Sequence, residues 1–353
     1  MLSPETIPQL LEIVRENPCV LPVGNGTKPG PEQDVPDDFT RIGMSALSGI
    51  IEYDPSEFTI TVLTGTPLAE IGDALAENRQ YLPFDPPLAA KGATIGGTVA
   101  TGLSGPGAYR FGPIRDFLIG VKFIDGEGNL VSGGGKVVKN AAGFDFPKFL
   151  IGSCGRLGVL VELTFKVFPR PEAEMTVGLP VEGTESAVDW IGRLSRGPYD
   201  AITFEPDRGI VAFRMSGHGI ALQKGIDSVD EELPVWPDEE ADFFWSRQQD
   251  FGWADPDAAL AKFPVTPSRI MNLEPMFSRA DPPRMYGLGG NVLYLSAMPS
   301  FIEKVASKIG PGLILRSPGD HPSPWVGRAQ PRAKIEKAVK VAIDPTGKFP
   351  TFD

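Results

Sequence analysis

Two glycine-rich segments of the chain hold residue types that can bind a phosphate-bearing ligand, residues 24–30 and residues 91–102. Glycines that accept positive φ allow consecutive backbone N–H groups to converge on phosphate oxygens. In the first segment Thr27 adds a hydroxyl donor and Lys28 adds a cation. A turn that binds nothing would use the same residues, so this segment alone leaves a phosphate site and a plain turn equally open.

The second segment strengthens the phosphate interpretation. Small side chains predominate over residues 92–102, which permits a close backbone approach to a ligand or to another part of the chain. Arg110 and Arg115 follow, and guanidinium groups are suitable partners for phosphate. Tight packing with surface arginines is the alternative. The G-x-G-x-x-G and G-x-x-x-x-G-K-S/T fingerprints are missing, so neither a Rossmann dinucleotide site nor a P-loop is indicated.

The elements around the first glycine-rich segment must position it to contact a ligand. Residues 19–23 form a short apolar run that predicts a strand leading directly into the glycines. Before it, Ser3 followed by Pro4 predicts a helix N-terminus, and Asn17 before a proline predicts its end. That helix would present one apolar face: Leu10, Leu11, Ile13 and Val14.

The rest of the chain predicts an α+β protein. Strand patterns occupy residues 49–64 (a hairpin), 116–125, 130–132 and 157–168, and helical patterns occupy 67–78, 184–194 and 331–341. Pro169 and Pro171 end the long strand and mark a predicted domain boundary. The order of elements lacks the regular strand–helix alternation of a doubly wound sheet. Residues 227–242 carry eight carboxylates and no Lys or Arg, which predicts a solvated loop.

The composition excludes several classes of protein. A chain of 353 residues with 41% hydrophobic residues can bury the cores of two domains. The net charge of −12 argues against a nucleic-acid partner. The first residues resemble no secretory leader, and no apolar stretch approaches the ~20 residues of a membrane span. Two cysteines, Cys19 and Cys154, suit a reducing compartment, so we expect a cytoplasmic protein.

Six stretches together match a known family: residues 24–28, 92–97, 104–112, 134–145, 152–167 and 344–349. They resemble the FAD-binding half of the vanillyl-alcohol-oxidase/p-cresol-methylhydroxylase (PCMH) superfamily, and within it the FAD-binding subunit of glycolate oxidase. The resemblance is nearly continuous over residues 18–171, is thin through the second half and returns near the C-terminus.

The resemblance implies non-covalent FAD and assigns its contacts to motif positions. The diphosphate would be held by Gly24, Asn25, Gly26, Thr27, Lys28, Thr94, Ile95, Gly96 and Gly97. Phosphates and ribityl chain would lie along Ser104, Gly105, Arg110 and Gly112. The adenine end or flavin edge would contact the backbone of Gly155, Gly158, Val159 and Val161. Lys139, Asn140 and Asp145 would lie beside the ring system.

The chain departs from the family pattern at two positions. Phe144 stands where the family has a tyrosine, and Arg156 stands where it has a threonine beside the expected cofactor. The two histidines, His218 and His321, are isolated, so we expect no metal site and nominate no catalytic base. No histidine precedes residue 218, which excludes a histidyl-linked flavin in the first domain.

The family also implies an organisation and a function. We expect a two-subdomain PCMH-type FAD-binding domain (1–171), a smaller α+β cap-like domain (172–325) and a C-terminal helix and tail (326–353) that return to the first. The favoured function is the FAD-binding subunit of a glycolate-type 2-hydroxy-acid oxidase or dehydrogenase complex. Its partners would be a larger flavin subunit and an iron–sulfur subunit, and the complex would be cytoplasmic or peripheral to the inner membrane. A stand-alone FAD-dependent hydroxy-acid dehydrogenase, and a non-catalytic assembly or electron-transfer subunit, are the alternatives.

Overall fold

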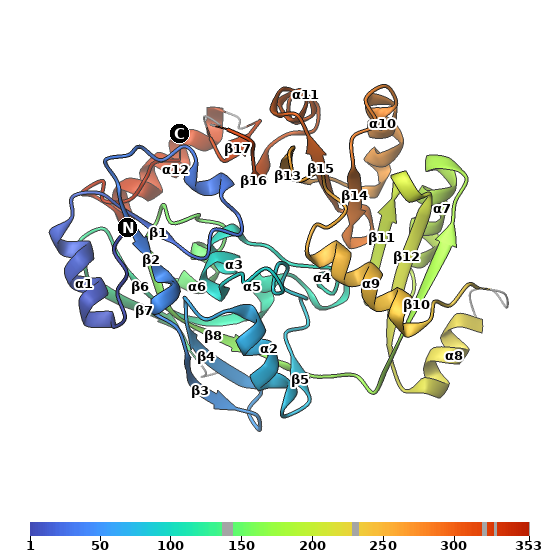
Figure 1. The fold of residues 1–353 in the computed structure, drawn as a ribbon, viewed down its shortest axis with the longest axis horizontal. Helices are drawn as coiled ribbons and strands as arrows, with labels where there is room; N and C mark the ends of the chain where they lie inside the picture. The colour runs from blue at the N-terminus through green and yellow to red at the C-terminus, as the bar shows by residue number, and fades with distance from the viewer. Residues whose placement is uncertain (136–143, 228–232, 320–322, 328–329, 353) are drawn as a thin grey trace.

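Two β-sheets with helices on their faces organise the chain (Figure 1). The computed structural model describes residues 1–135, 144–227, 233–319, 323–327 and 330–352. The N-terminal half builds one block and residues after Pro171 build the other, while the C-terminal helix returns to the first block (Figure 1). The mixed architecture of sheets and helices agrees with the α+β class predicted from the sequence.

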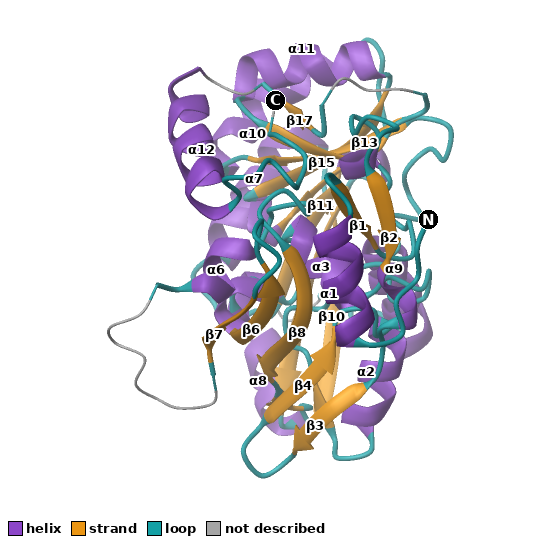
Figure 2. Cartoon of the chain, turned by 90° about the vertical axis from the view of Figure 1, so that its left-hand side faces the viewer, coloured by secondary structure: helices purple, strands orange, loops and turns teal. Residues whose placement is uncertain are grey.

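The N-terminal block is built around an antiparallel five-stranded sheet in the order β3-β4-β8-β6-β7. Its strands are β3 (Ile50–Asp54), β4 (Thr59–Leu63), β8 (Val159–Lys166), β6 (Leu118–Ile124) and β7 (Leu130–Gly134). Figure 2 shows β4, β8 and β6 next to one another. A separate parallel pair joins β1 (Val20–Val23) to β2 (Thr40–Gly43), and β5 (Gln80–Tyr81) pairs with β9 (Phe168–Pro169).

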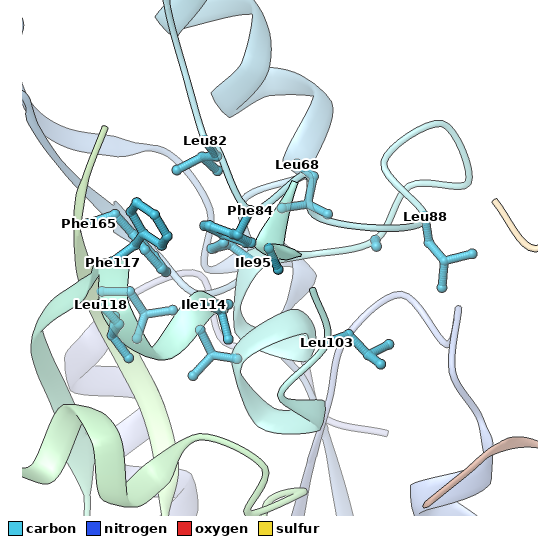
Figure 3. Packing of buried hydrophobic residues seen from close by; sticks show 14 of the residues in the cluster. Leu68, Leu82, Phe84, Leu88, Ile95, Leu103, Ile114, Phe117, Leu118 and Phe165 are labelled. Atoms are coloured by element: carbon cyan, nitrogen blue, oxygen red, sulfur yellow. The ribbon is translucent and has the colours of Figure 1, made fainter. Parts of the chain in front are cut away.

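The helices of this block are short. They are α1 (Ile7–Glu16), α2 (Leu68–Ala76), α3 (Ile95–Thr101), α4 (Ala108–Phe111), α5 (Ile114–Phe117) and α6 (Phe146–Leu150), with 3-10 turns η1 (Gly30–Glu32) and η2 (Met44–Ala46). Figure 3 shows part of their packing on the sheet, where Leu68 of α2 and Ile95 of α3 lie in one apolar cluster with Phe84, Phe117 and Phe165. This packing fixes α3, which borders the candidate site described below.

The second block contains an antiparallel eight-stranded sheet in the order β10-β12-β11-β14-β15-β13-β16-β17. Its strands are β10 (Ala173–Pro180), β11 (Ala201–Glu205), β12 (Ile210–Gly217), β13 (Ala259–Pro264), β14 (Arg284–Gly287), β15 (Val292–Ala297), β16 (Gly312–Arg316) and β17 (Trp325–Val326). The helices are α7 (Gly183–Leu194), α8 (Gly219–Asp227), α9 (Asp238–Gln249), α10 (Pro267–Phe277) and α11 (Pro299–Ile309), with turns η3 (Pro206–Arg208) and η4 (Leu288–Gly290).

The large sheet is apolar on both faces. Along β13, Ala261 and Phe263 join the cluster that α7, α10 and α11 cover on the outer face. Leu260 points the other way and joins the core of the N-terminal block, as do Met285 and Tyr294 from neighbouring strands. Because successive side chains of a strand alternate between faces, the large sheet packs on its own helices and on the first block.

The C-terminal segment ties the two ends of the chain together. Helix α12 (Gln330–Ile343) is followed by a tail in which Phe349 is buried in a cluster with Leu10 and Val14 of α1. The carbonyl of Lys348 accepts a hydrogen bond from Val20 N at 2.8 Å, at the start of β1. The tail therefore supports the strand that leads into the first glycine segment.

Two sequence predictions are wrong in detail. Helix α1 begins after Thr6, not at Ser3, because Thr6 and Gln9 form a reciprocal capping box that satisfies two backbone N–H groups. The acidic run is not a loop throughout, since Asp238 starts α9 and its carboxylates stand at the helix N-terminus, where the helix dipole favours them. The predicted domain division stays a prediction, and β17 straddles its second boundary.

Candidate functional site

A cavity with about 760 Å³ of empty space lies where the two glycine segments meet, and it is called the first cavity below. Its walls come from β1 and the loop after it, η1, α3 and the turn before β8. Ten predicted cofactor residues line it: Gly24, Asn25, Gly26, Thr27, Lys28, Thr94, Gly96, Gly97, Gly155 and Gly158. Sequence motifs far apart in the chain are thus brought to one place.

Direct contacts hold the two glycine segments together. The side chain of Asn25 donates from Nδ2 to the carbonyl of Gly92 at 2.7 Å. A Cβ on Gly24 would lie 2.7 Å from Thr94 Oγ1, which is closer than real Cβ atoms come. Gly26 has a φ of +65°, a conformation that glycine adopts without strain. Glycine at these positions therefore permits both the turn and the close approach.

The loop after β1 offers more unused donors than the N-terminus of α3. The N–H groups of Ile95 and Gly96 already donate to Thr66 O and Thr64 O, at 3.0 and 2.9 Å. In the described part of the chain, by contrast, no hydrogen-bond partner is found for the backbone N–H groups of residues 25–28. A row of such N–H groups is suited to phosphate oxygens.

Lys28 adds a buried cation to these donors. Its side chain lines the first cavity, is 7% exposed and makes no ion pair with any described carboxylate. Its Nζ donates to Thr27 Oγ1 at 3.0 Å. Burial lowers the pKa of Lys28 to about 8, although the nearby carboxylate of Glu32 acts in the opposite direction. Because Lys28 forms no ion pair with Glu32, which also lines the cavity, an anionic ligand would stabilise the buried ammonium.

The opposite wall is formed by the turn before β8. Gly155 has a φ of +74°, and a Cβ there would lie 3.1 Å from Pro22 Cγ, so glycine lets this turn pack on β1. Cys154 also lines the cavity, and burial raises the pKa of its thiol to about 11. The thiol therefore stays protonated at neutral pH. Cys154 was not among the predicted cofactor residues, although the nearby Gly152 and Gly155 were a usable signal.

Arg156 lies behind this wall rather than in the cavity. It is fully buried and donates to Pro31 O at 2.9 Å and Asp34 Oδ1 at 2.6 Å. Its Nε donates to Thr351 O at 3.1 Å, and its guanidinium lies 4.8 Å from the ring of Trp325. Arg156, which departs from the family pattern, thus connects η1 with the C-terminal tail.

Other predicted cofactor residues lie outside the first cavity. Ile95, Val159 and Val161 have their side chains buried in apolar clusters. Gly112 ends α4 with a φ of +93°. Lys139 and Asn140 lie outside the described residues. The assignment of these positions to the cofactor stays a prediction.

The charged members of this group have other partners. Arg110 pairs with Asp200 of the second block at 2.6 Å. Asp145 caps α6 by accepting from Lys148 N at 3.2 Å, and it pairs with Lys148 Nζ at 2.9 Å. Phe144 is 59% exposed and packs edge-on against neighbouring phenylalanines. These contacts give each residue a structural role that the motif alone does not reveal.

Ser104 and Gly105 border a second, smaller cavity between the two blocks. Its lining comes from both blocks: Pro87, Ser104, Gly105, Pro106, Thr203, Gln248, Gln249, Phe251, Met285, Gly287, Leu288 and Tyr294. The Ser104 hydroxyl accepts from Ile114 N at 2.9 Å. Apolar side chains predominate, and no sequence pattern indicated the residues that the second block contributes.

No metal centre or membrane-spanning helix is found in the part of the chain that the structure describes. No group of three or more His, Cys, Asp and Glu side chains there could hold a metal ion. None of the helices there is both long and apolar enough to cross a bilayer. His218 is exposed and contacts Glu172, and His321 lies outside the described residues.

Known proteins resemble this chain in sequence over less than half of its length. The chain is 46% identical over 129 residues to glycolate oxidase subunit GlcE of Escherichia coli K12, which covers 36% of this chain and 37% of that one. It is 31% identical over 147 residues to a D-lactate dehydrogenase of Anaerostipes hadrus, covering 42% and 30%. The matched stretch thus spans about a third of the length of these curated relatives.

The fold extends further than the sequence similarity. A solved alkyldihydroxyacetonephosphate synthase superposes with a TM-score of 0.69 at 16% identity, covering 98% of this chain and 75% of that one. At this identity the likeness concerns the fold alone. The family model described as FAD binding domain matches residues 1–134, which include the first cavity's two glycine segments. Residues 1–134 are therefore similar to FAD-binding domains, and FAD is the cofactor that this similarity indicates.

Proposed function

We propose that the chain is the FAD-binding subunit of a 2-hydroxy-acid oxidoreductase complex that acts on glycolate or a similar small acid. The single observation that carries the proposal is the buried Lys28 ammonium beside the unused N–H groups of residues 25–28. This donor set suits a diphosphate. The named activities of the relatives, glycolate oxidase and D-lactate dehydrogenase, support the substrate class.

The chain's own residues would bind and orient the cofactor. Lys28 and Thr27 would hold the diphosphate, while Gly97 would let the backbone of α3 approach it. Gly155 and Gly158 would border the cofactor on the side of β8. When bound, the flavin supplies the redox chemistry, accepting a hydride equivalent from the α-carbon of a hydroxy acid or relaying electrons. The larger flavin subunit and the iron–sulfur subunit that we propose as partners would take the electrons onward, in a cytoplasmic complex.

One observation favours the second candidate, an electron-transfer or assembly subunit. Neither the lining of the second cavity nor that of the first includes a histidine among the residues described, so no imidazole base is at hand for a hydroxy acid. In that case a partner would supply the catalytic base, and this chain would supply a bound flavin.

Titration of the flavin-free full chain with FAD tests the proposed cofactor site. Lys28→Met should weaken FAD binding by about 1.5–3 kcal/mol, the value of a hydrogen bond to a charged group, or about 10- to 150-fold. Lys166→Met, which removes an exposed lysine at the far end of β8, is the control and should leave the affinity unchanged. Equal FAD affinities of the wild type and Lys28→Met would contradict the proposed site.

A further inference from the structure

The first cavity contains one carboxylate that the proposed phosphate site leaves unused. Glu32, in the turn η1, lines this cavity together with Thr27 and Lys28 and is partly buried. Its backbone N–H donates to Pro29 O at 2.9 Å, and its carbonyl accepts from Val35 N at 3.3 Å. The backbone therefore holds Glu32 at the cavity wall, and the side chain is the part that a ligand can contact.

Within the described residues, the carboxylate of Glu32 has no hydrogen-bond donor and no ion-pair partner. Besides Lys28, the cation near it is Arg41, which donates to Val35 O at 3.3 Å and lies 4.0 Å from Asp37. Burial raises the pKa of Glu32, and the positive charges of Arg41 and Lys28 act against this rise. A desolvated carboxylate with no partner is stabilised by a hydroxyl or amino group that donates to it.

Glu32 is the one anionic side chain among the described residues that line the first cavity. The ammonium of Lys28 and the N–H groups of residues 25–28 attract phosphate oxygens. A carboxylate does the opposite, since it repels phosphate and accepts hydrogen bonds from neutral donors. A ligand that satisfies the whole cavity therefore carries a phosphate and also a hydroxyl or amino donor near that phosphate.

The carboxylate of Glu32 and the ammonium of Lys28 lie near each other. Burial lowers the pKa of Lys28, and the charge of Glu32 acts against this effect. Since no ion pair joins the two side chains in the described structure, they are free to contact different parts of one ligand. In a nucleotide the sugar is bonded directly to the phosphate, so its hydroxyls lie only a few bonds from the phosphate oxygens. A sugar therefore matches this arrangement better than a more distant ring does.

We propose that Glu32 accepts a hydrogen bond from a hydroxyl of the sugar that is attached to the phosphates bound at Lys28. Glu32 thereby makes the first cavity select a sugar diphosphate over inorganic pyrophosphate. The proposal rests on the proposed FAD site and adds a specificity-determining residue to it. FAD offers two such sugars, the ribose of its adenosine half and the ribityl chain of its flavin half.

Binding measurements on the flavin-free full chain test this role below pH 7, where Lys28 stays protonated. The probes are inorganic pyrophosphate, ADP, IDP (in which a carbonyl replaces the amino group of adenine) and FAD. Glu32→Met removes the acceptor and keeps a side chain of similar length. It should lower the affinity for the sugar-bearing probes about tenfold relative to pyrophosphate, because a hydrogen bond to a charged group is lost. Pyrophosphate itself should bind Glu32→Met at least as tightly as the wild type, because a negative charge near the phosphates is removed.

Two further variants keep the outcomes distinct. Glu32→Gln retains a neutral acceptor, so it should lose less of the preference for sugar-bearing probes than Glu32→Met does. Asp37→Asn removes an exposed carboxylate outside the cavity lining, and it should leave every affinity ratio unchanged. Unfolding in urea checks that each variant folds, and Glu32→Gln carries the test if Glu32→Met does not fold.

The set of probes identifies the sugar. A loss of affinity for ADP, IDP and FAD assigns the hydrogen bond to the ribose, and a loss for FAD alone assigns it to the ribityl chain. A loss for ADP that is absent for IDP would overturn the proposal, because the donor would then be the amino group of adenine. Unchanged ratios of ADP and FAD affinity to pyrophosphate affinity in Glu32→Met would also overturn it.

Failure of the proposed function gives a different result. In that case FAD does not bind the wild type, whereas ADP and IDP still report on Glu32. A wild type that binds none of the four probes would overturn both proposals.

Discussion

At the scale of single residues, Lys28 makes the affinity for FAD depend on pH. Burial lowers the pKa of its ammonium to about 8 in the unliganded chain, and a bound diphosphate would raise it again. Binding thus favours the protonated form. FAD affinity should be flat below pH 8 and should fall as the pH rises above it, because the free chain must then take up a proton to bind.

A FAD titration between pH 6.5 and pH 9.5 measures this dependence. Lys28→Met should bind FAD weakly and with no change across pH 8. A wild-type affinity that increases above pH 8 would contradict the role given to Lys28.

Arg156 is predicted to act on stability and not directly on the cofactor. Its guanidinium is buried against Asp34, whose side chain is also nearly buried, 6% exposed. Replacing one partner of a buried pair leaves an uncompensated charge and costs about 3–5 kcal/mol. Arg156→Met should therefore lower the free energy of unfolding in urea by that amount. Arg193→Met, at an exposed arginine stacked on Trp190, should change it by less than about 1 kcal/mol.

At the scale of elements, helix α3 contains one glycine that packs against the core, Gly96, and one that borders the first cavity, Gly97. A Cβ on Gly96 would lie 2.7 Å from Thr64 O, in the core between α3 and β4. A Cβ on Gly97 would meet Thr94 Oγ1 at 3.2 Å and Lys28 Nζ at 3.9 Å, on the cavity side. Gly97→Val should therefore fold and lose FAD affinity, whereas Gly96→Val should lose stability.

The matched control for Gly97→Val is Gly72→Val on the exposed side of α2, where an added Cβ has no neighbour within 4 Å. Both substitutions place a β-branched residue in a helix, so their propensity costs are similar. Thermal unfolding and FAD titration of the three variants are the measurements. Equal FAD affinities of Gly97→Val and Gly72→Val would remove α3 from the proposed site.

The sequence predicted the elements of the N-terminal block better than those of the second block. Regular apolar patterns and turn residues marked the hairpin of β3 and β4, and α2 and α12 appeared within a few residues of their predicted bounds. Helices α9, α10 and α11 were not predicted. Helix α10 contains Pro275, and α9 begins with three acidic residues that favour a loop when read alone. Packing against the large sheet stabilises these helices, and a local sequence pattern does not reveal that packing.

At the scale of the whole molecule, long-range contacts explain which site residues could be predicted. The backbone conformation and the close packing at the first cavity require glycine, so residue type and spacing were enough to predict these positions. Gln248, which lines the second cavity, has no such signature, because that cavity is lined by residues of both blocks that lie far apart in the chain. The partners of Arg110 and Arg156 likewise lie far along the chain, at Asp200 and Asp34.

The C-terminal tail should stabilise the molecule because it packs against α1 and β1, the first elements of the N-terminal block. Phe349 is 1% exposed and packs with α1 and β1. Phe349→Ala should lower the free energy of unfolding by about 3–5 kcal/mol, the usual cost of emptying a buried phenylalanine site. Phe243→Ala, at a side chain that is 67% exposed, is the control and should cost less than about 0.5 kcal/mol. Similar losses in the two variants would show that the tail is not part of the cooperative core.

The visible spectrum of the purified full chain, recorded before and after addition of glycolate without oxygen, tests the central claim most directly. We predict a flavin band near ~450 nm from a cofactor that acid releases from the protein, because we expect FAD to be bound non-covalently. Bleaching by glycolate would establish the chain as a catalyst, and a stable band would assign catalysis to a partner. A chain that shows no flavin band, even after incubation with FAD, would contradict the account.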